Sequence, residues 1–370
     1  MPTLTYQQLL QVIKEYVNEN KISVESLSVT RNNIVGLADK IGAVITLDNT
    51  FTDKLSIFDA GTMNFGRTVE EWYEDLILPT DYDSEGAGAL SPSDPSYRPV
   101  AYSYALDKKK FKTTRRYNDV ERAVNNEAEF VEIIAKITKR LYDSFTSFMY
   151  ASKRQALGVL AKMCINEMNE TAVYSASGNY SVNTVLKESS GSNTRGIVFK
   201  PYKSSLNLAW ADAVKQGYIV PLDLVSTMSF PADTTTGEAF IKQVKKDAEI
   251  ANDESQGHSL NGNSLGATSD LVLVLKQGVM PSIDVDTLAG AFHQDRLAFN
   301  AEPIVVPDFG SDENNVFAIL TDSRTIRMFN NYRALREQEN ADGDFINYFL
   351  HTENTMHISR NTFVKIYRAS

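Results

Sequence analysis

The feature that most constrains this fold is a run of apolar residues that recur every three or four positions between Glu127 and Cys164. Its members are Phe130, Ile134, Ile137, Leu141, Phe145, Phe148, Met149, Leu157, Leu160, Met163 and Cys164. An α-helix returns to the same face at these intervals, so the pattern predicts one amphipathic helix of about ten turns, interrupted only by Gly158. Asn125 or Asn126 is a suitable N-cap. The apolar stripe of such a helix must be covered, and a sheet can cover it.

The segment before this helix, 61–120, lacks the apolar residues that a core of its own would need. Glycine and proline punctuate it, and 85–97 has the composition of a loop. The flanking stretches 68–78 and 101–115 are strand-like, and together they predict a long projecting hairpin. Apolar burial contributes only about 25 cal/mol per Å², so the hairpin must find that area on a partner. We therefore expect the chain to associate with other copies of itself.

The whole chain of 370 residues is long enough for two or more lobes. Before 61 we expect helices at 4–18 and 32–41 and extended segments at 43–47 and 55–58. After the long helix we expect a hairpin or surface loop at 174–200. A compact α/β lobe follows, with helices at 205–216, 237–251 and near 285–292 and strands at 271–275, 303–306 and 316–320. The last predicted strands are 325–332, 344–352 and 362–367.

Composition excludes several classes of protein. Lysine and arginine total 37 against 47 aspartates and glutamates, and this acidic balance is unlike that of a dedicated nucleic-acid binder. Cys164 is the only cysteine, which excludes an internal disulfide and a thiolate metal cluster. The start of the chain has no basic segment followed by an apolar one, so no secretory signal is expected. The apolar run 271–275 is too short to cross a bilayer.

Residues that could carry catalysis or bind a metal have simpler explanations. His351 and His357 would share one face of a strand with Glu353, which makes a metal site conceivable, but a hydrogen-bonded or solvent-facing pair is the better explanation. His258 lies in a polar loop without a partner pattern. Motifs of hydrolases, nucleotide-binding loops and zinc proteases are absent from the sequence. No metal ion is expected.

Two further candidates are also explained without chemistry. Asp284 and Asp286 precede a predicted helix, where N-capping accounts for them. Cys164 lies on the apolar stripe, where a buried thiol is inert. We therefore expect neither a catalytic residue nor a cofactor.

The charges of the predicted hairpin are segregated. Its first strand and the following loop are acidic without a lysine or arginine, at Glu70, Glu71, Glu74, Asp75, Asp81, Asp83 and Glu85. Its second strand is basic without an acid, at Lys108, Lys109, Lys110, Lys112, Arg115 and Arg116. The strands could neutralise each other, or complementary patches could join neighbouring copies and set their register. A nucleic-acid interpretation is weaker, because only Phe111 interleaves the basic run.

Three stretches carry a resemblance to a known family. The first is the Gly-Arg-Thr-apolar-Glu-Glu run within 65–76, followed by Tyr82 and Asp83. The second runs from 270–275 through 283–292, and a looser third begins at Thr236-Gly237 and continues with Phe240, Val244, Lys245 and Lys246. With the order of its elements, the chain resembles, over about 31–370, the Hong Kong 97-type major capsid proteins of tailed bacteriophages. The similarity is greatest to the short-tailed phages of the phi-29 group.

The resemblance implies an α+β fold of Hong Kong 97 type with a set of named parts. These are an N-terminal arm (1–42), an extended loop (43–120), a peripheral domain with a spine helix (121–205, helix about 127–164), an axial domain (206–321), a hairpin returning to the peripheral domain (322–360) and a C-terminal strand of the axial domain (361–370). Some members carry a C-terminal immunoglobulin-like domain, and none is expected here.

The resemblance also implies a structural function and not an enzymatic one. Copies would assemble in the host bacterial cytoplasm into pentamers and hexamers of an icosahedral or prolate virion head. Scaffolding, portal and other head proteins would be partners, double-stranded DNA would be packaged without sequence specificity, and no membrane would be involved. We expect inter-subunit contacts at Arg67, Glu70, Glu71, Glu74, Lys108, Lys110, Arg115 and Arg116. The alternatives are an encapsulin-like nanocompartment shell and an intracellular enzyme with a site in 206–321.

Overall fold

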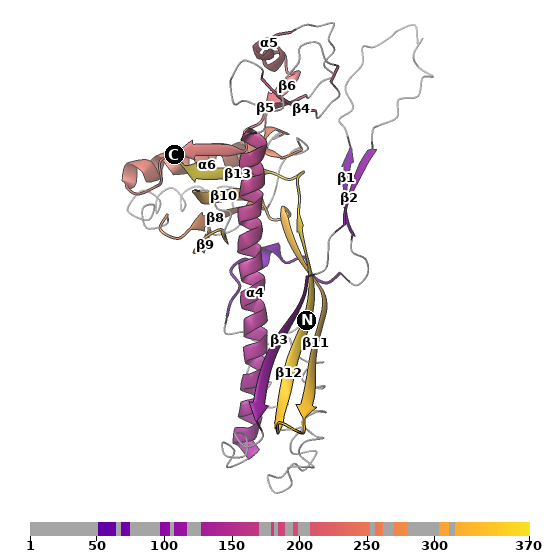
Figure 1. The fold of residues 1–370 in the computed structure, drawn as a ribbon. Coiled ribbons are helices and arrows are strands. Elements are labelled where there is room, and N and C mark those ends of the chain that lie inside the picture. Colours follow the sequence, from indigo (N-terminus) through magenta and orange to yellow (C-terminus); the bar gives the residue numbers. More distant parts are fainter. Residues whose placement is uncertain are drawn as a thin grey trace. The chain divides into compact units, whose positions relative to one another are not determined.

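The computed structural model describes residues 51–63, 68–74, 97–103, 107–116, 127–169, 179–180, 184–188, 195–198, 208–251, 256–261, 270–279, 303–310 and 315–370 (Figure 1). The predicted helices 4–18, 32–41 and 285–292 and the segment 43–47 lie outside these residues. The described residues form two compact units. The first unit takes them from 1–67, 105–152 and 328–356, and the second from 68–104, 153–327 and 357–370.

The first unit is built from a three-stranded sheet and the first part of α4 (Glu127–Asn169). The strands are β3 (Asp107–Arg116), β11 (Ile326–Asn340) and β12 (Phe345–Ile358), in the order β11-β12-β3. The central strand β12 pairs antiparallel with β3. Phe111 of β3 packs edge-on against Phe145 and Phe148 of α4, with ring centroids 6.2 and 5.9 Å apart. The sheet therefore covers the helix stripe, as the periodicity predicts.

A short 3-10 turn, η1 (Ser56–Phe58), also belongs to the first unit. The prediction of an extended segment at 55–58 is wrong, because Asp53 Oδ1 accepts a hydrogen bond of 2.8 Å from the Leu55 amide and starts a turn. Phe58 N then donates to Leu55 O at 3.1 Å, and the turn buries both apolar side chains. The chain continues beside β11, where Ala60 N donates to Met328 O at 2.9 Å.

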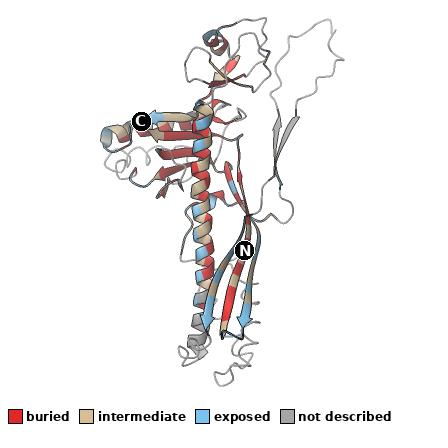
Figure 2. Ribbon diagram, viewed as in Figure 1, coloured by how far each residue is buried: buried red, intermediate tan, exposed pale blue. Residues whose placement is uncertain are grey.

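The second unit contains a five-stranded sheet in the order β7-β13-β10-β8-β9. These strands are β7 (Val225–Met228), β8 (Leu271–Lys276), β9 (Ile304–Val306), β10 (Val316–Asp322) and β13 (Val364–Ala369). β10 is antiparallel to β8 and β13, whereas the outer pairs β7–β13 and β8–β9 are parallel. Strands β8 and β10 are buried along almost their whole length (Figure 2), which agrees with their uninterrupted apolar sequences.

Helix α6 (Thr234–Ala251) covers this sheet. Asp233 begins it as the N-cap, because its Oδ1 accepts a hydrogen bond of 2.8 Å from the Thr236 amide. Phe240, Val244 and Ala248 recur at four-residue intervals and are buried in the same core as the sheet residues. The predicted helix 237–251 and strands 271–275, 303–306 and 316–320 thus form one helix-covered sheet.

The second unit also holds a small antiparallel sheet, β4 (Val185–Lys187), β5 (Arg195–Val198) and β6 (Ile219–Pro221). Helix α5 (Trp210–Lys215) packs on it, with Trp210 in a core that includes Ile219. The β4–β5 pair fulfils the hairpin prediction for 174–200. A 3-10 turn, η3 (Gln256–His258), and the ribbon formed by β1 (Thr68–Glu74) and β2 (Tyr97–Ser103) complete the unit.

Candidate functional site: the acidic ribbon and the basic strand

The acidic and basic segments of the predicted hairpin belong to different sheets. β1 pairs antiparallel with β2, from Thr68↔Ser103 to Glu74↔Tyr97. The basic strand β3 instead pairs with β12, from Asp107↔Asn354 to Arg116↔Phe345. The prediction that 101–115 is one hairpin strand is therefore wrong in its second half. The physical reason is Phe111, which buries its ring against α4 while the lysines beside it remain exposed.

Glu71 of the ribbon is bound by a residue near the end of β12 and by one in the segment that joins β12 to β13. Its Oε1 lies 2.6 Å from Nε2 of His357, and its Oε2 accepts a hydrogen bond of 2.5 Å from Nδ2 of Asn361. Burial would raise the pKa of Glu71, but its hydrogen bonds with His357, Ser359 and Asn361 outweigh burial and lower it. The ionised carboxylate can only accept, so His357 donates from Nε2.

The neighbouring glutamates of β1 differ from Glu71. Glu70 is exposed, since successive side chains of a strand point to opposite faces. Glu74 is the last residue of β1, and Arg67 lies outside the described residues. The predicted acidic contact residues are therefore not equivalent, because one of them is already bound within its own chain.

The basic residues of β3 form a row along one edge of the three-stranded sheet. Lys108 pairs with Glu353 on β12 at 3.3 Å, while its own side chain remains 68% exposed. The ammonium groups of Lys110 and Lys112 lie 5.6 and 5.7 Å from the centre of the Phe349 ring. Arg115 and Arg116 are exposed at the end of the strand. The fold thus gathers Lys108, Lys110, Arg115 and Arg116 on one edge strand.

A shallow hollow of about 280 Å³ opens beside this strand in the first unit. Its lining comes from all three strands: Lys108, Lys109, Tyr332, Arg336, His351, Thr352 and Glu353. The cations outnumber the single carboxylate, so the hollow favours an anionic group. Arg336 and Tyr332 were not expected there, because their proximity to β3 depends on the pairing of distant strands.

The histidines are placed differently from the metal-site hypothesis. His351 lines the hollow, His357 binds Glu71, and Glu353 pairs with Lys108, so the three do not form one cluster. His258, for which the sequence shows no partner pattern, lies against two residues that are distant in the sequence. Its ring stacks on Phe363, with centroids 5.2 Å apart, and it faces Asp223.

His258 belongs to a partly buried polar cluster that sequence reasoning missed. Its Nε2 lies 3.6 Å from Asp223 Oδ2, and the ligand atoms of Asp223, Asp247 and His258 lie within 4.8 Å of one another. Such a spacing can hold a divalent cation, but the ammonium of Lys365 already contacts Asp223 Oδ1. Asp247 accepts hydrogen bonds on both oxygens, one of them from Tyr367 at 2.7 Å. The arrangement therefore favours an internal ion pair over a metal centre.

The electrostatics of this cluster follow from its contacts. Burial alone would raise the pKa of the Asp223 carboxyl, but His258 and Lys365 more than offset burial and hold the pKa well below its usual range. Burial and the charge of Asp247 both raise the pKa of Tyr367, so its hydroxyl stays protonated and donates to Asp247. Lys365 is fully buried on β13, and its pairing fixes that strand to the loop before β7.

The cysteine is placed as expected. Cys164 is fully buried on α4, and burial raises the pKa of its thiol far above the usual range. Asp284 and Asp286 lie outside the described residues. Among the helices that the structure describes, none combines the length and apolar character that crossing a membrane requires.

Comparison with known proteins decides the family. The model of the Phi29-like phage major capsid protein family matches residues 5–364. The chain belongs to this family. The resemblance to capsid proteins of the phi-29 group that was stated from the sequence is thereby confirmed.

Relatives of this family member support the assignment. The major capsid protein of Bacillus phage GA-1 is 23% identical over 88% of this chain and 57% of the relative. That of Bacillus phage PZA is 23% identical over 90% of this chain and 62% of the relative. The chain thus spans about three fifths of the length of these relatives. A chain in the capsid structure of Staphylococcus phage Andhra is similar with a TM-score of 0.54 and 12% identity, over 88% of this chain and 85% of that one. This likeness shows an α+β fold shared with phage capsids.

Proposed function

We propose that the chain is the subunit from which a phage head shell is built. Copies join as pentamers and hexamers into an icosahedral or prolate shell around double-stranded DNA, which is packaged without sequence specificity. The observation that carries the proposal is the family match over residues 5–364. The relatives are named as phage capsid proteins, which favours a packaged genome over the cargo of an encapsulin-like compartment. The chain is made in the host bacterium and becomes part of the virion, with scaffolding and portal proteins as partners.

The fold we propose for the assembled subunit is of Hong Kong 97 type, with the part boundaries given above. The five-stranded sheet under α6 suits an axial domain at 206–321, and β13 suits a C-terminal strand added to it from 361–370. The long helix α4 suits a spine helix, and the β11–β12 pair suits the returning hairpin at 322–360. The ribbon β1–β2 supports an extended loop within 43–120.

The contact we propose between subunits joins the basic strand β3 of one copy to the acidic segment 70–85 of another. Among the described strands β3 is at the edge of its sheet, with β12 as its neighbour on one side, and its exposed lysines and arginines offer positive charge. The hollow beside it accepts an anionic side chain. Complementary charge of this kind fixes register and accelerates encounter more than it adds affinity.

Charge reversal at the end of β3 tests this proposal. The variant Arg115→Glu/Arg116→Glu changes two exposed residues, and Lys215→Glu/Lys246→Glu makes the same change in net charge on other exposed positions. We expect the wild type and the lysine control to form shells, seen by negative-stain electron microscopy. The arginine variant should remain as small, folded species with an unchanged circular dichroism spectrum. Raised ionic strength should weaken wild-type assembly.

Two results would count against it. Normal shells from the Arg115→Glu/Arg116→Glu variant would remove β3 from the contact. A wild-type chain that sediments as a stable monomer, even with its scaffolding partner present, would contradict the shell function itself.

A further inference from the structure

The binding of Glu71 within its own chain distinguishes it from its exposed neighbour Glu70 on β1. Both oxygens of the carboxylate are bound, one by His357 and the other by Asn361. His357 is almost completely buried, and the Glu71 side chain retains only 16% exposure. A surface charge that serves only a neighbouring subunit has no need of two donors within its own chain, one of which is buried. Its partners lie 286 and 290 residues further along the sequence.

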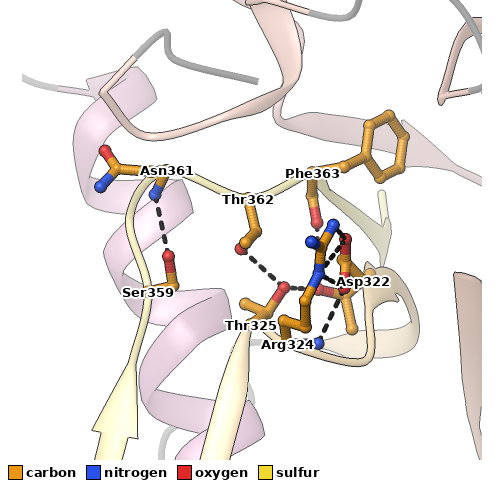
Figure 3. A network of polar contacts seen from close by, with 8 residues as sticks. Asp322, Arg324, Thr325, Ser359, Asn361, Thr362 and Phe363 are labelled. Atoms are coloured by element: carbon orange, nitrogen blue, oxygen red, sulfur yellow. Dashed lines mark hydrogen bonds and ion pairs between the residues drawn. The ribbon is translucent and has the colours of Figure 1, made fainter. Parts of the chain in front are cut away.

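The turn that carries Asn361 is itself fixed to the turn between β10 and β11. Ser359 N donates to Thr325 O at 2.7 Å, and its hydroxyl accepts from Asn361 N at 3.1 Å. Figure 3 shows this connection, in which the hydroxyls of Thr362 and Thr325 also meet at 2.8 Å. One donor of Glu71, His357, therefore sits near the end of β12, and the other, Asn361, sits on the anchored turn that follows it.

The amide of Asn361 is oriented by a second contact. Its Oδ1 accepts a hydrogen bond of 2.9 Å from Nδ2 of Asn261, so its Nδ2 is the atom left to face Glu71. The backbone supports the same geometry, because Asn261 N donates to Arg360 O at 3.0 Å. The amide of Asn361 is thus oriented toward Glu71 by contacts that do not involve the glutamate.

A ribbon of two strands has little stability of its own in water and depends on what holds it. We propose that Glu71 is a positioning residue, which clasps the β1–β2 ribbon to the turn between β12 and β13 so that the subunit offers its acidic segment in one direction. The importance of this clasp for assembly rests on the proposed shell function. A ribbon ordered in advance loses less conformational freedom when a second copy binds.

Hydrogen exchange of the unassembled wild-type chain and its variants tests the clasp. Glu71→Gln keeps the size of the side chain and removes its charge, and Glu70→Gln is the matched control on the exposed face of the same strand. Hydrogen bonds to a charged group are the stronger kind, so we expect the amides of β1 and β2 to exchange roughly ten- to a hundredfold faster in Glu71→Gln. Glu70→Gln should exchange like the wild type. Asn361→Ala, which removes one donor from the other side, should accelerate the same amides.

The results separate the clasp from the shell function. Unchanged exchange of β1 in both Glu71→Gln and Asn361→Ala, or equal acceleration in Glu70→Gln, would overturn the clasp. If Glu71→Gln accelerates exchange throughout the chain, the substitution has destabilised the whole fold and no longer tests the clasp. The exchange of the β1 and β2 amides in Asn361→Ala then decides alone. Shell formation is then scored separately by electron microscopy, where we expect Glu71→Gln to lower the yield of closed shells at least tenfold. Failure of the wild type to form shells would contradict the shell function while leaving the exchange result valid.

Discussion

Removing the ring of Phe240 should destabilise the second unit strongly, because this ring lies at the centre of the core between α6 and its sheet. Phe240 is 1% exposed and makes edge-to-face contacts with Phe317 and Tyr367, with ring centroids 5.4 and 5.3 Å apart. Truncation to alanine removes a fully buried side chain and both contacts. Core Phe→Ala substitutions reduce the free energy of unfolding by about 3–5 kcal/mol, which includes the cavity that remains.

The chain provides a matched control in Phe230. Its ring contacts the same Phe317 ring, with centroids 5.6 Å apart, but Phe230 is 39% exposed. An aromatic pair contributes about 0.5–1.5 kcal/mol beyond area burial. The Phe230 ring is already partly in contact with solvent, so truncating it gives up less buried area than truncating Phe240. Phe230→Ala should therefore lower the free energy of unfolding by about 1 kcal/mol. The two variants remove the same type of residue from the same partner ring, Phe317, and differ in how far the removed ring is buried.

Urea unfolding of the unassembled chain, followed by far-ultraviolet circular dichroism, measures both effects. With a denaturant dependence of about 2–3 kcal/mol per M, Phe240→Ala should move the midpoint down by roughly 1–2 M and Phe230→Ala by less than about 0.5 M. Equal shifts for the two variants would refute the reasoning, because they would mean that α6 does not bury this face against β10 and β13.

Two further predictions concern the same unit. Gly196→Ala should reduce the free energy of unfolding of this unit by about 1–3 kcal/mol, because a Cβ there would lie 2.5 Å from Ile219 and 2.8 Å from Trp210. The melting temperature measured by tryptophan fluorescence should fall, and an unchanged value would contradict the prediction. The lowered pKa of Asp223 means that its pairing with Lys365 stabilises the fold above the usual aspartate pKa of about 3.9 and is lost as pH falls through the lowered value. The urea midpoint of the wild type should thus fall more steeply in acid than that of Asp223→Asn, and parallel pH profiles would contradict this.

Local pattern sufficed for much of the fold. The three- and four-residue spacing predicts α4 from its observed start at Glu127, and the helix ends at Asn169, five residues past Cys164, where the predicted pattern ends. The uninterrupted apolar sequences of β8 and β10 predict buried strands, and both are central in their sheet. These elements are decided by residues that are neighbours in the sequence.

Long-range pairing could not be predicted in the same way. The alternation in 107–116 predicts a strand equally well whether its partner is β1 or β12, and only the burial of Phe111 against α4 decides between them. The bond from Glu71 to Asn361 and the packing of His258 on Phe363 join residues about 290 and 105 positions apart. Neither contact produces a pattern among residues that are close in the sequence. The sequence therefore could not distinguish Glu71, which is bound within the chain, from its exposed neighbour Glu70.

The place of β13 in its sheet has a consequence for synthesis on the ribosome. β13 lies between β7 and β10, so this sheet stays open until residues 364–369 have been translated. At about 5–20 residues per second, β7 waits roughly 7–27 s for the strand that pairs with it. During that interval the nascent polypeptide exposes an unfilled gap between strands, where a chaperone could bind and a truncated product would stay vulnerable to proteolysis. Only chains translated through β13 can close this gap, so translation itself limits which molecules become competent to polymerise.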